Sequence, residues 1–375
     1  MKILLLCWRD TTHPQGGGSE RYLERVGEYL AAHGHEVIYH TSRHTDAPRR
    51  SERRGVHYHR AGGKFTVYPR AVGRLLLAAV GLGPLAGVDA IIDTQNGIPF
   101  FARAVSRRPT ILLTHHCHRE QWPVAGPVIA RLGWFLESRA APAIYRGAPY
   151  ITVSTPSAEE LVALGVRPED IHIIRNGVDP VPARVPTLPR EAPIHMITLS
   201  RLVPHKQIEQ AIDVVAGLPD AHLDIVGDGW WAEELSARAD KSGARERITF
   251  HGQCSEAFKH ALLARADIHL MPSRKEGWGL AVVEAAQHGT PTIGYRSSGG
   301  LRDSIVDGET GLLADTPSEF ARLIQRLHDD PAERRRLGEA ARERARAYSW
   351  AATGEAIAQL LEEHTTTRGP RARRP

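Results

Sequence analysis

Short apolar runs rich in β-forming residues alternate with helix-length segments along most of the chain. Apolar strands separated by such segments are typical of parallel sheets covered by helices on both faces. The alternation occurs in two series, and a proline-rich stretch separates them. The expected strands are residues 3–7, 36–40, 90–93, 110–114 and 150–153, then residues 194–199, 222–226, 247–250, 267–271 and 292–294. The sequence therefore predicts an α/β chain with two Rossmann-like, doubly wound parallel-sheet domains.

The stretch between the two series, residues 179–193, contains five prolines. Proline fixes φ and lacks a backbone N–H, so this stretch favours an extended connector over a helix. We place the domain boundary here, with an N-terminal domain over residues 1–185 and a C-terminal domain over residues 186–350. We expect the last helix, within residues 351–375, to cross back to the first domain. Two such sheets can face each other across a cleft at their carboxyl ends, where ligands of this fold class bind.

The composition is that of a globular protein, with 42% hydrophobic and 24% charged residues. The three cysteines are far apart, so they form neither a disulfide framework nor a zinc-type spacing, and a reducing cytoplasm fits best. The N-terminal apolar run, residues 3–8, is too short for a signal peptide. The longest apolar stretch, residues 75–88, is shorter than a bilayer span and is interrupted by glycine and proline. We expect a cytoplasmic protein without a transmembrane helix.

The formal net charge is +5, and arginines cluster at residues 49–54 and 368–375. No aromatic residues are interleaved with these arginines to stack bases, so we expect surface charge and no nucleic-acid partner. The expected helix over residues 128–138 mixes Trp134 and Phe135 with arginines. We expect this helix to be buried against the core of its domain. The alternative is peripheral contact with the inner face of the membrane, because helices that lie on membranes contain a similar mixture.

Two glutamates, Glu276 and Glu284, lie eight positions apart across a glycine-rich turn and an expected helix start near Leu280. Gly277 and Gly279 permit close backbone approach, and a helix start presents unpaired N–H groups and a positive dipole end to an anion. The side chain of Glu284 leans back toward that helix start. Because carboxylates repel phosphate, both acids suit sugar hydroxyls. The alternative is that both merely favour a helix N-terminus.

The second series of strands opens with a strand that is followed by a basic pair, Arg201 and Lys206. The planar guanidinium fork and the compact ammonium together neutralise a diphosphate better than either group alone. Surface charge is the alternative interpretation of this pair. Combined with the helix start near Leu280, the pair predicts a diphosphate site.

Three glycines, Gly16, Gly17 and Gly18, follow the first strand and lead into an expected helix, where they would expose backbone N–H donors. The third glycine of a dinucleotide fingerprint is missing, and no G-x-x-x-x-G-K-[ST] sequence occurs. These absences argue against a dinucleotide-binding enzyme and against a P-loop kinase or ATPase. A plain loop is the alternative role of the glycines.

Three histidines, His115, His116 and His118, follow the fourth strand. Adjacent positions at a strand end point to opposite sides, and no matching acid or cysteine pattern follows, so we expect no metal. We expect instead that one histidine of this cluster donates a hydrogen bond to a sugar hydroxyl or a phosphate.

Together these motifs resemble those of the retaining nucleotide-sugar glycosyltransferases of family 4, which have the GT-B fold. The resemblance covers most of the chain and is strongest over residues 194–313. Its elements are Gly17-Gly18-Ser19-Glu20, Thr114-His115-His116, Asn176 to Asp179, Ser200-Arg201-Leu202 with Lys206, Val226 to Gly229, Phe250 to Gly252, and Pro272-Ser273 with Glu276 to Glu284. Seven such elements in the family's order are specific, although each alone is weak.

The resemblance implies a role for each site residue. Arg201 and Lys206 bind the donor diphosphate, and Gly279 and Leu280 offer it backbone N–H groups. Glu284 holds the nucleotide ribose. The implied donor-binding set is Gly17, Gly18, Arg201, Lys206, Gly279, Leu280 and Glu284.

The resemblance also implies three roles at the reaction centre. Glu276 contacts the transferred sugar, His116 lies near the reacting bond, and Gly17 and Gly18 lie close to the phosphate or the acceptor. The implied catalytic set is His116, Arg201, Lys206 and Glu276.

The implied activity is metal-independent transfer of a hexosyl group from a nucleoside diphosphate sugar to a hydroxyl acceptor, with retention at the anomeric carbon and no cofactor. The acceptor class is a glycolipid, a polysaccharide or a natural product. Two alternatives stay open: a GT-B-type sugar-nucleotide epimerase or phosphorylase, and a noncatalytic partner that binds a nucleotide sugar.

Overall fold

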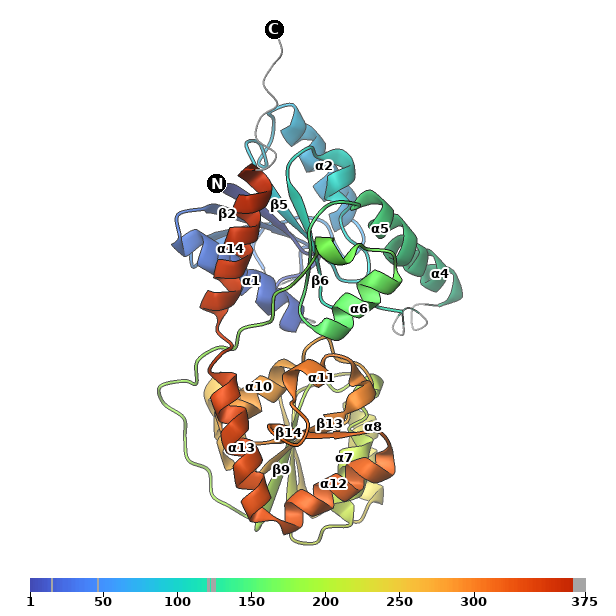
Figure 1. Cartoon of the computed structure of the whole chain (residues 1–375), viewed down its shortest axis with the longest axis vertical. Coiled ribbons are helices and arrows are strands. Elements are labelled where there is room, and N and C mark those ends of the chain that lie inside the picture. Colours follow the sequence, from blue (N-terminus) through green and yellow to red (C-terminus); the bar gives the residue numbers. More distant parts are fainter. Residues whose placement is uncertain (15, 46, 120–121, 123–125, 367–375) are drawn as a thin grey trace. The chain divides into compact units, whose positions relative to one another are not determined.

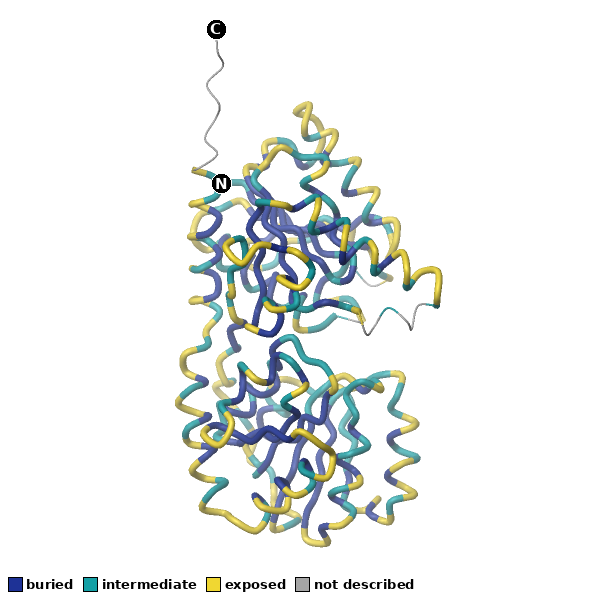
Figure 2. The backbone as a smooth tube through the Cα atoms, turned by 45° about the vertical axis from the view of Figure 1, so that its right-hand side comes forward, coloured by how far each residue is buried: buried dark blue, intermediate teal, exposed yellow. Residues whose placement is uncertain are grey.

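Each of the ten apolar runs overlaps a strand in the computed structural model, which describes residues 1–14, 16–45, 47–119, 122 and 126–366. The strands form two sheets in two units of the chain (Figure 1). The first unit contains Met1–Gly177 and the segment from Trp350 onward, and the second unit contains Val178–Ser349. Figure 2 shows that the strands are buried in each unit, whereas the helices alternate between buried and exposed faces.

The first unit is built on an eight-stranded sheet with the order β3-β4-β2-β1-β5-β6-β7-β8. All neighbouring strands are parallel except β3 and β4, which are antiparallel. The strands are β1 (Lys2–Leu6), β2 (Glu36–Thr41), β3 (Arg50–Arg53), β4 (Val56–Arg60), β5 (Ala90–Gln95), β6 (Thr110–Thr114), β7 (Tyr150–Thr152) and β8 (Ile171–Ile173). Leu4 and Leu5 in β1 are completely buried although they point to opposite faces, because helices cover both sides.

The helices of the first unit lie on both faces of its sheet. They are α1 (Gly18–Ala32), α2 (Val67–Ala79), α3 (Ala102–Val105), α4 (Pro127–Phe135), α5 (Ala141–Ile144), α6 (Thr155–Ala163) and α14 (Trp350–Thr366). Right-handed crossovers place α1 on one face and α2 to α6 on the other. The last helix, α14, packs against α1, and Gly354 permits this approach because a Cβ there would lie 2.2 Å from the Tyr29 ring.

The second unit is built on a six-stranded parallel sheet with the order β11-β10-β9-β12-β13-β14. Its strands are β9 (Ile194–Leu199), β10 (Ala221–Val226), β11 (Ile248–Gly252), β12 (Ile268–Met271), β13 (Thr292–Tyr295) and β14 (Gly311–Ala314). Its helices are α7 (Glu209–Ala216), α8 (Ala232–Lys241), α9 (Glu256–Arg265), α10 (Leu280–Gln287), α11 (Leu301–Ser304), α12 (Pro317–Asp329) and α13 (Pro331–Ala345). The prediction of two parallel α/β sheets is confirmed.

The two units divide at Gly177 and Val178, eight residues before the boundary that the prolines indicate. Val178 belongs to the second unit because it forms a β-bridge with Ser349, and its N–H donates to the carbonyl of Tyr348 at 3.4 Å. The proline-rich connector therefore lies within the second unit. The expected C-terminal helix begins at Trp350 in the first unit, and the basic tail after residue 366 lies outside the described residues.

The expectation that the helix near residues 128–138 is buried is wrong. Leu132 and Phe135 of α4 are 58% and 57% exposed. Gly133 is the buried position of this helix, and a Cβ there would lie 2.3 Å from the Trp122 ring. The helix thus turns a small residue inward, whereas four of its large apolar residues are exposed and Trp134 is half-buried. No helix within the described ranges is both long and apolar enough to cross a lipid bilayer.

Candidate functional site

The loop that follows β9 carries Arg201 and packs against the loop that follows β10. Gly227 has φ +128°, and a Cβ there would lie 1.8 Å from the carbonyl oxygen of Ser200. A Cβ at Gly229 would lie 2.1 Å from the carbonyl oxygen of Leu202. Only glycine permits such close backbone contact. These two glycines therefore fix the backbone on both sides of Arg201, whose side chain is exposed.

Lys206 ends the same loop in a short 3-10 turn and forms an ion pair with Glu276. The Lys206 Nζ lies 2.5 Å from Oε1 of Glu276, and the two side chains are 13% and 11% exposed. The Arg274 N–H donates to the carbonyl of His205 at 2.8 Å, which joins the loop after β9 to the loop after β12. The structure thus brings together the cation expected at the diphosphate and the acid expected at the sugar.

The backbone of Glu276 is held by the loop that follows β13. The Glu276 N–H donates to the Ser298 carbonyl at 2.8 Å, and the Glu276 carbonyl accepts from the Gly300 N–H at 2.9 Å. A Cβ at Gly300 would lie 2.2 Å from the carbonyl oxygen of Gly277. The carboxylate of Glu276 therefore projects from a backbone that is fixed on both sides.

The helix α10 begins at Leu280, and its N-cap residue is Gly279. Gly279 has φ +90° and ψ 65°, a left-handed conformation, and it supplies no side-chain cap to the first helical N–H groups. A Cβ at this position would lie 2.9 Å from Cδ2 of Leu301. The start of α10 therefore presents backbone donors at a point where a side chain would be both strained and crowded.

Glu284 lies one turn inside α10 and forms an ion pair with Lys259 of α9. The Lys259 Nζ lies 2.8 Å from Oε1 of Glu284 and 2.8 Å from Oε2 of Glu256. Burial opposes the charged form of Lys259, but the two carboxylates outweigh it and raise the pKa of the ammonium above its usual value. Sequence reasoning missed Lys259, because nothing in the motif around Glu284 indicates a partner 25 residues away.

Four of the expected site residues lie at one edge of the second sheet. The strands β10, β9, β12 and β13 are consecutive in this sheet and parallel, so the loops after them meet at the same carboxyl edge. The loop after β9 carries Arg201 and Lys206, and the loop after β12 carries Glu276 and Gly279. The edge therefore combines two cations, a carboxylate and a helix start.

In the first unit, Gly17 is the N-cap of α1 and Gly18 is its first residue. The carboxylate of Glu20 is completely buried, and it accepts hydrogen bonds from the Gly17 N–H at 2.8 Å and from Nε of Arg9 at 2.7 Å. Nδ2 of Asn96, in the loop after β5, donates to the same carboxylate at 3.1 Å. Glu20 therefore holds the glycine turn against the carboxyl end of the first sheet, whereas Gly18 is exposed.

The three histidines after β6 have different surroundings. His115 is buried against the Tyr22 ring, with 5.0 Å between ring centroids, and burial lowers the pKa of His115 to about 4. Nδ1 of His118 lies 3.2 Å from Oε1 of the buried Glu137. The His116 ring stacks on the His118 ring at 4.6 Å. Among the described residues, no three His, Cys, Asp or Glu side chains form a group suited to a metal ion.

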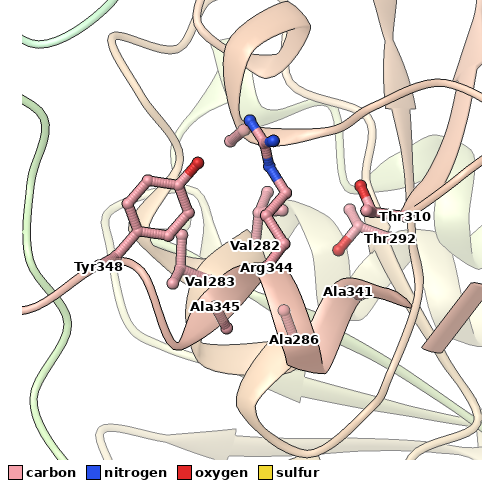
Figure 3. A pocket seen from close by; sticks show the side chains of 10 residues that line it. Val282, Val283, Ala286, Thr292, Thr310, Ala341, Arg344, Ala345 and Tyr348 are labelled. Carbon is pink, nitrogen blue, oxygen red and sulfur yellow. The ribbon is translucent and has the colours of Figure 1, made fainter. Parts of the chain in front are cut away.

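A small cavity lies between α10 and α13 (Figure 3). It is lined by Val282, Val283, Ala286, Thr292, Ser304, Thr310, Ala341, Arg344, Ala345 and Tyr348. Five of these ten residues are apolar, and none of the ten is an expected site residue. The Tyr348 ring also packs edge-on against Trp278, with 5.2 Å between the ring centroids. This cavity therefore belongs to the packing that supports α10 and not to the candidate site.

Comparison with known families assigns both units. The profile described as Glycosyltransferase Family 4 matches residues 16–182, and the profile described as Glycosyl transferases group 1 matches residues 183–344. A glycogen synthase of Mycobacterium tuberculosis is 33% identical over 239 residues, which are 60% of this chain and 56% of that protein. The chain thus spans little more than half the length of this relative.

Solved structures show the same fold over nearly the whole chain. Sucrose-phosphate synthase from Thermosynechococcus elongatus has a TM-score of 0.82 at 22% identity, covering 98% of this chain and 100% of that chain. HepE of Anabaena, solved in complex with UDP and glucose, has a TM-score of 0.73 at 19% identity, covering 97% of this chain and 100% of that chain. At 22% and 19% identity, these two similarities show the fold alone.

Proposed function

Because the chain belongs to glycosyltransferase family 4 and has the GT-B fold, we propose that it transfers a hexosyl group from a nucleoside diphosphate sugar to a hydroxyl acceptor. The observation that carries this proposal is the ion pair of Lys206, after β9, and Glu276, in the loop that leads from β12 into α10. A cation for a diphosphate and an acid for a sugar meet there beside a helix N-terminus.

The donor diphosphate binds at the carboxyl edge of the second sheet. Arg201 and Lys206 supply positive charge, and Gly279 and Leu280 supply backbone N–H donors at the start of α10. Burial, with the neighbouring ammonium of Lys206, lowers the pKa of His205 to about 4. His205 is therefore neutral near pH 7, and the two longer cations provide the charge of this site.

Donor binding exchanges one ion pair for another. The diphosphate competes with Glu276 for Lys206, because a diphosphate carries more negative charge than one carboxylate. The released carboxylate of Glu276 then accepts hydrogen bonds from hydroxyls of the transferred sugar. Glu284 stays oriented by Lys259 and accepts hydrogen bonds from the ribose hydroxyls.

The reaction breaks the bond between the anomeric carbon and the diphosphate oxygen, and it forms a bond from that carbon to the acceptor oxygen on the same face of the sugar. The proton of the acceptor hydroxyl moves to the departing phosphate oxygen, so retention needs no nucleophile from the protein. Arg201, Lys206 and the N–H groups of α10 stabilise the negative charge on the diphosphate, which is the work that a metal ion does in other transferases.

The first unit supplies the acceptor side of this reaction. We assign His116 to the vicinity of the reacting bond and Gly17 and Gly18 to the phosphate or the acceptor. The acceptor is a glycolipid, a polysaccharide or a natural product. Nucleotide sugars are consumed in the cytoplasm in this scheme, and the protein acts there.

Incubation of the purified chain with a panel of UDP-, GDP- and TDP-sugars tests the proposal. We expect release of one nucleoside diphosphate by slow donor hydrolysis, in which water takes the glycosyl group, and Arg201→Ala and Lys206→Ala should abolish most of it. Lys241→Ala, which removes an exposed cation at the end of α8, is the matched control and should retain full release. Epimerised donor without diphosphate release would make the chain an epimerase. Donor binding without any product would make it a noncatalytic partner.

A further inference from the structure

The positive charge of the first unit is concentrated in one part of the sequence. Between residues 61 and 158 there are ten lysines and arginines but only four acids, whereas the whole chain has a net charge of +5. Two of the four acids, Asp93 and Glu137, are completely buried. The basic cluster at residues 49–54, in contrast, is partly neutralised, since Arg53 and Arg54 pair with glutamates of α1. The positive excess therefore lies in the segment between β4 and β7, on its helices and on the loops that join them.

The helix α4 exposes four large apolar side chains on this basic part of the unit. Val128, Ile129, Leu132 and Phe135 are 78%, 51%, 58% and 57% exposed. Their spacing places them on one side of the helix, because residues three and four positions apart share a face. The helix contains Arg131 and no acid.

A second apolar group lies at the other end of the same segment. Phe65, Leu76, Leu77, Val80 and Leu82 are 71%, 52%, 48%, 71% and 59% exposed at the two ends of α2 and in the turn that follows it. The helix α2 contains two arginines and no acid.

The two apolar groups are on one side of the first sheet. The crossovers from β4 to β5, from β5 to β6 and from β6 to β7 run in the same direction along the sheet order. Because such crossovers are right-handed, α2 and α4 cover the same face of the sheet. Figure 1 shows α2, α5 and α4 following one another along one edge of this unit. Their outer surfaces, the α2–α4 surface, combine exposed leucines, valines and phenylalanines with exposed arginines.

We propose that the α2–α4 surface docks on a lipid bilayer that contains anionic lipids. The apolar side chains of α4 and of the turn after α2 insert at the boundary of headgroups and acyl chains, and the arginines beside them attract the anionic headgroups. The charge of the surface favours this occupant, because neither helix contains an acid and anionic headgroups attract a surface whose charged residues are arginines. This inference adds a surface to the proposed function and does not depend on it.

Co-sedimentation of the full chain with vesicles tests the proposal. We expect binding to vesicles of phosphatidylglycerol mixed with phosphatidylcholine, weaker binding as salt is raised, and little binding to pure phosphatidylcholine. The double variant Leu132→Ser with Phe135→Ser should weaken binding by at least about tenfold, because it removes two apolar side chains from the inserted face. Both residues are exposed, so the thermal midpoint of unfolding should stay near that of the wild-type chain.

Val162→Ser is the matched control, because Val162 is a 43% exposed apolar residue on α6, beside Glu159 and Glu160. It should leave vesicle binding unchanged. Equal binding of the double variant and the wild-type chain would overturn the proposal, as would failure of the wild-type chain to bind the anionic vesicles. A dimer that the double variant converts to a monomer, without vesicle binding, would assign the surface to self-association and also overturn it.

Discussion

The ammonium of Lys206 donates to the carboxylate of Glu276 across 70 residues of sequence, and both side chains are largely buried. Neither charged group is therefore free in solvent before a ligand binds. Their pairing keeps a carboxylate at the edge of a diphosphate site without leaving an uncompensated charge there. A bound diphosphate has to replace that carboxylate as the partner of Lys206.

Removal of each member of this pair should have opposite effects on diphosphate binding. In Glu276→Gln, Lys206 loses its competing partner, so we expect UDP or GDP to bind at least as tightly as to the wild-type chain. In Lys206→Ala, a charge-assisted contact is lost, so affinity should fall by about 10- to 100-fold. Isothermal titration calorimetry with both nucleotides measures the two effects.

Turnover should fall in both variants, by about 100-fold or more, since each loses a group that acts on the donor in the transition state. The divergence between affinity and turnover in Glu276→Gln is the diagnostic result. If Glu276→Gln weakened nucleotide binding as much as Lys206→Ala, the exchange of ion pairs would be excluded.

Replacement of Lys259 by methionine should raise the donor KM more than it lowers kcat. The change leaves the partly buried Glu284 without its cation, at a cost of about 1–3 kcal/mol. Lys259→Arg, which keeps the charge, should recover much of the loss, and Lys241→Met should behave as the wild-type chain. Steady-state kinetics over a range of donor concentrations makes the distinction, and an unchanged KM in Lys259→Met would remove Glu284 from the donor site.

Gly279→Ala should destabilise the chain and weaken nucleotide binding together. A left-handed backbone costs an alanine about 1–2 kcal/mol, and the added Cβ would also meet Leu301 at 2.9 Å. Gly73 of α2 is the control, since a Cβ there meets nothing within 4 Å and Gly73→Ala should stabilise the helix by up to about 1 kcal/mol. Thermal unfolding with and without nucleotide measures the stability and the nucleotide binding of each variant. Full nucleotide affinity in Gly279→Ala would show that the start of α10 does not bind the diphosphate.

Stability should fall as the pH is lowered from about 6.5 toward 4. Burial lowers the pKa of His115 and of His269 to about 4, whereas both titrate near 6.5 when unfolded. In that window the unfolded chain binds more protons than the folded chain, so acid favours unfolding. For the fully buried His269 the loss is on the order of 2 kcal/mol at pH 5. His269→Gln should flatten the pH dependence of urea unfolding between pH 7 and pH 5, and an unchanged slope would contradict this assignment.

Turnover should be insensitive to EDTA. The cations of the site provide the charge that a divalent ion would otherwise supply, so removal of metals leaves the diphosphate contacts intact. Loss of activity in EDTA followed by rescue with Mg²⁺ or Mn²⁺ would contradict the metal-free mechanism.

The central strands could be predicted because they are covered on both faces, so their sequences are continuous apolar runs. β1 and β9 are examples, and both are almost entirely buried. β3 could not be found in this way, since it is an antiparallel edge strand with the sequence Arg-Ser-Glu-Arg. Its arginines indicated only surface charge, because pairing of an exposed edge leaves no hydrophobic pattern.

The site residues could be named from spacing, but their partners could not. Gly279 and Leu280 lie at the helix start that the glycines indicated. The ion pairs of Glu276 and Glu284 join residues 70 and 25 positions apart, so they depend on the order of strands in the sheet. The outward face of α4 was also unpredictable, because Gly133 takes the inner position by contact with Trp122.

A crystal structure of the chain with its tightest-binding nucleoside diphosphate tests the central claim most directly. We expect the diphosphate oxygens within about 3 Å of the Lys206 ammonium and of the N–H groups of Gly279 and Leu280, with Glu276 no longer paired to Lys206. A diphosphate bound away from the start of α10, or a complex in which Lys206 remains paired with Glu276, would contradict the account.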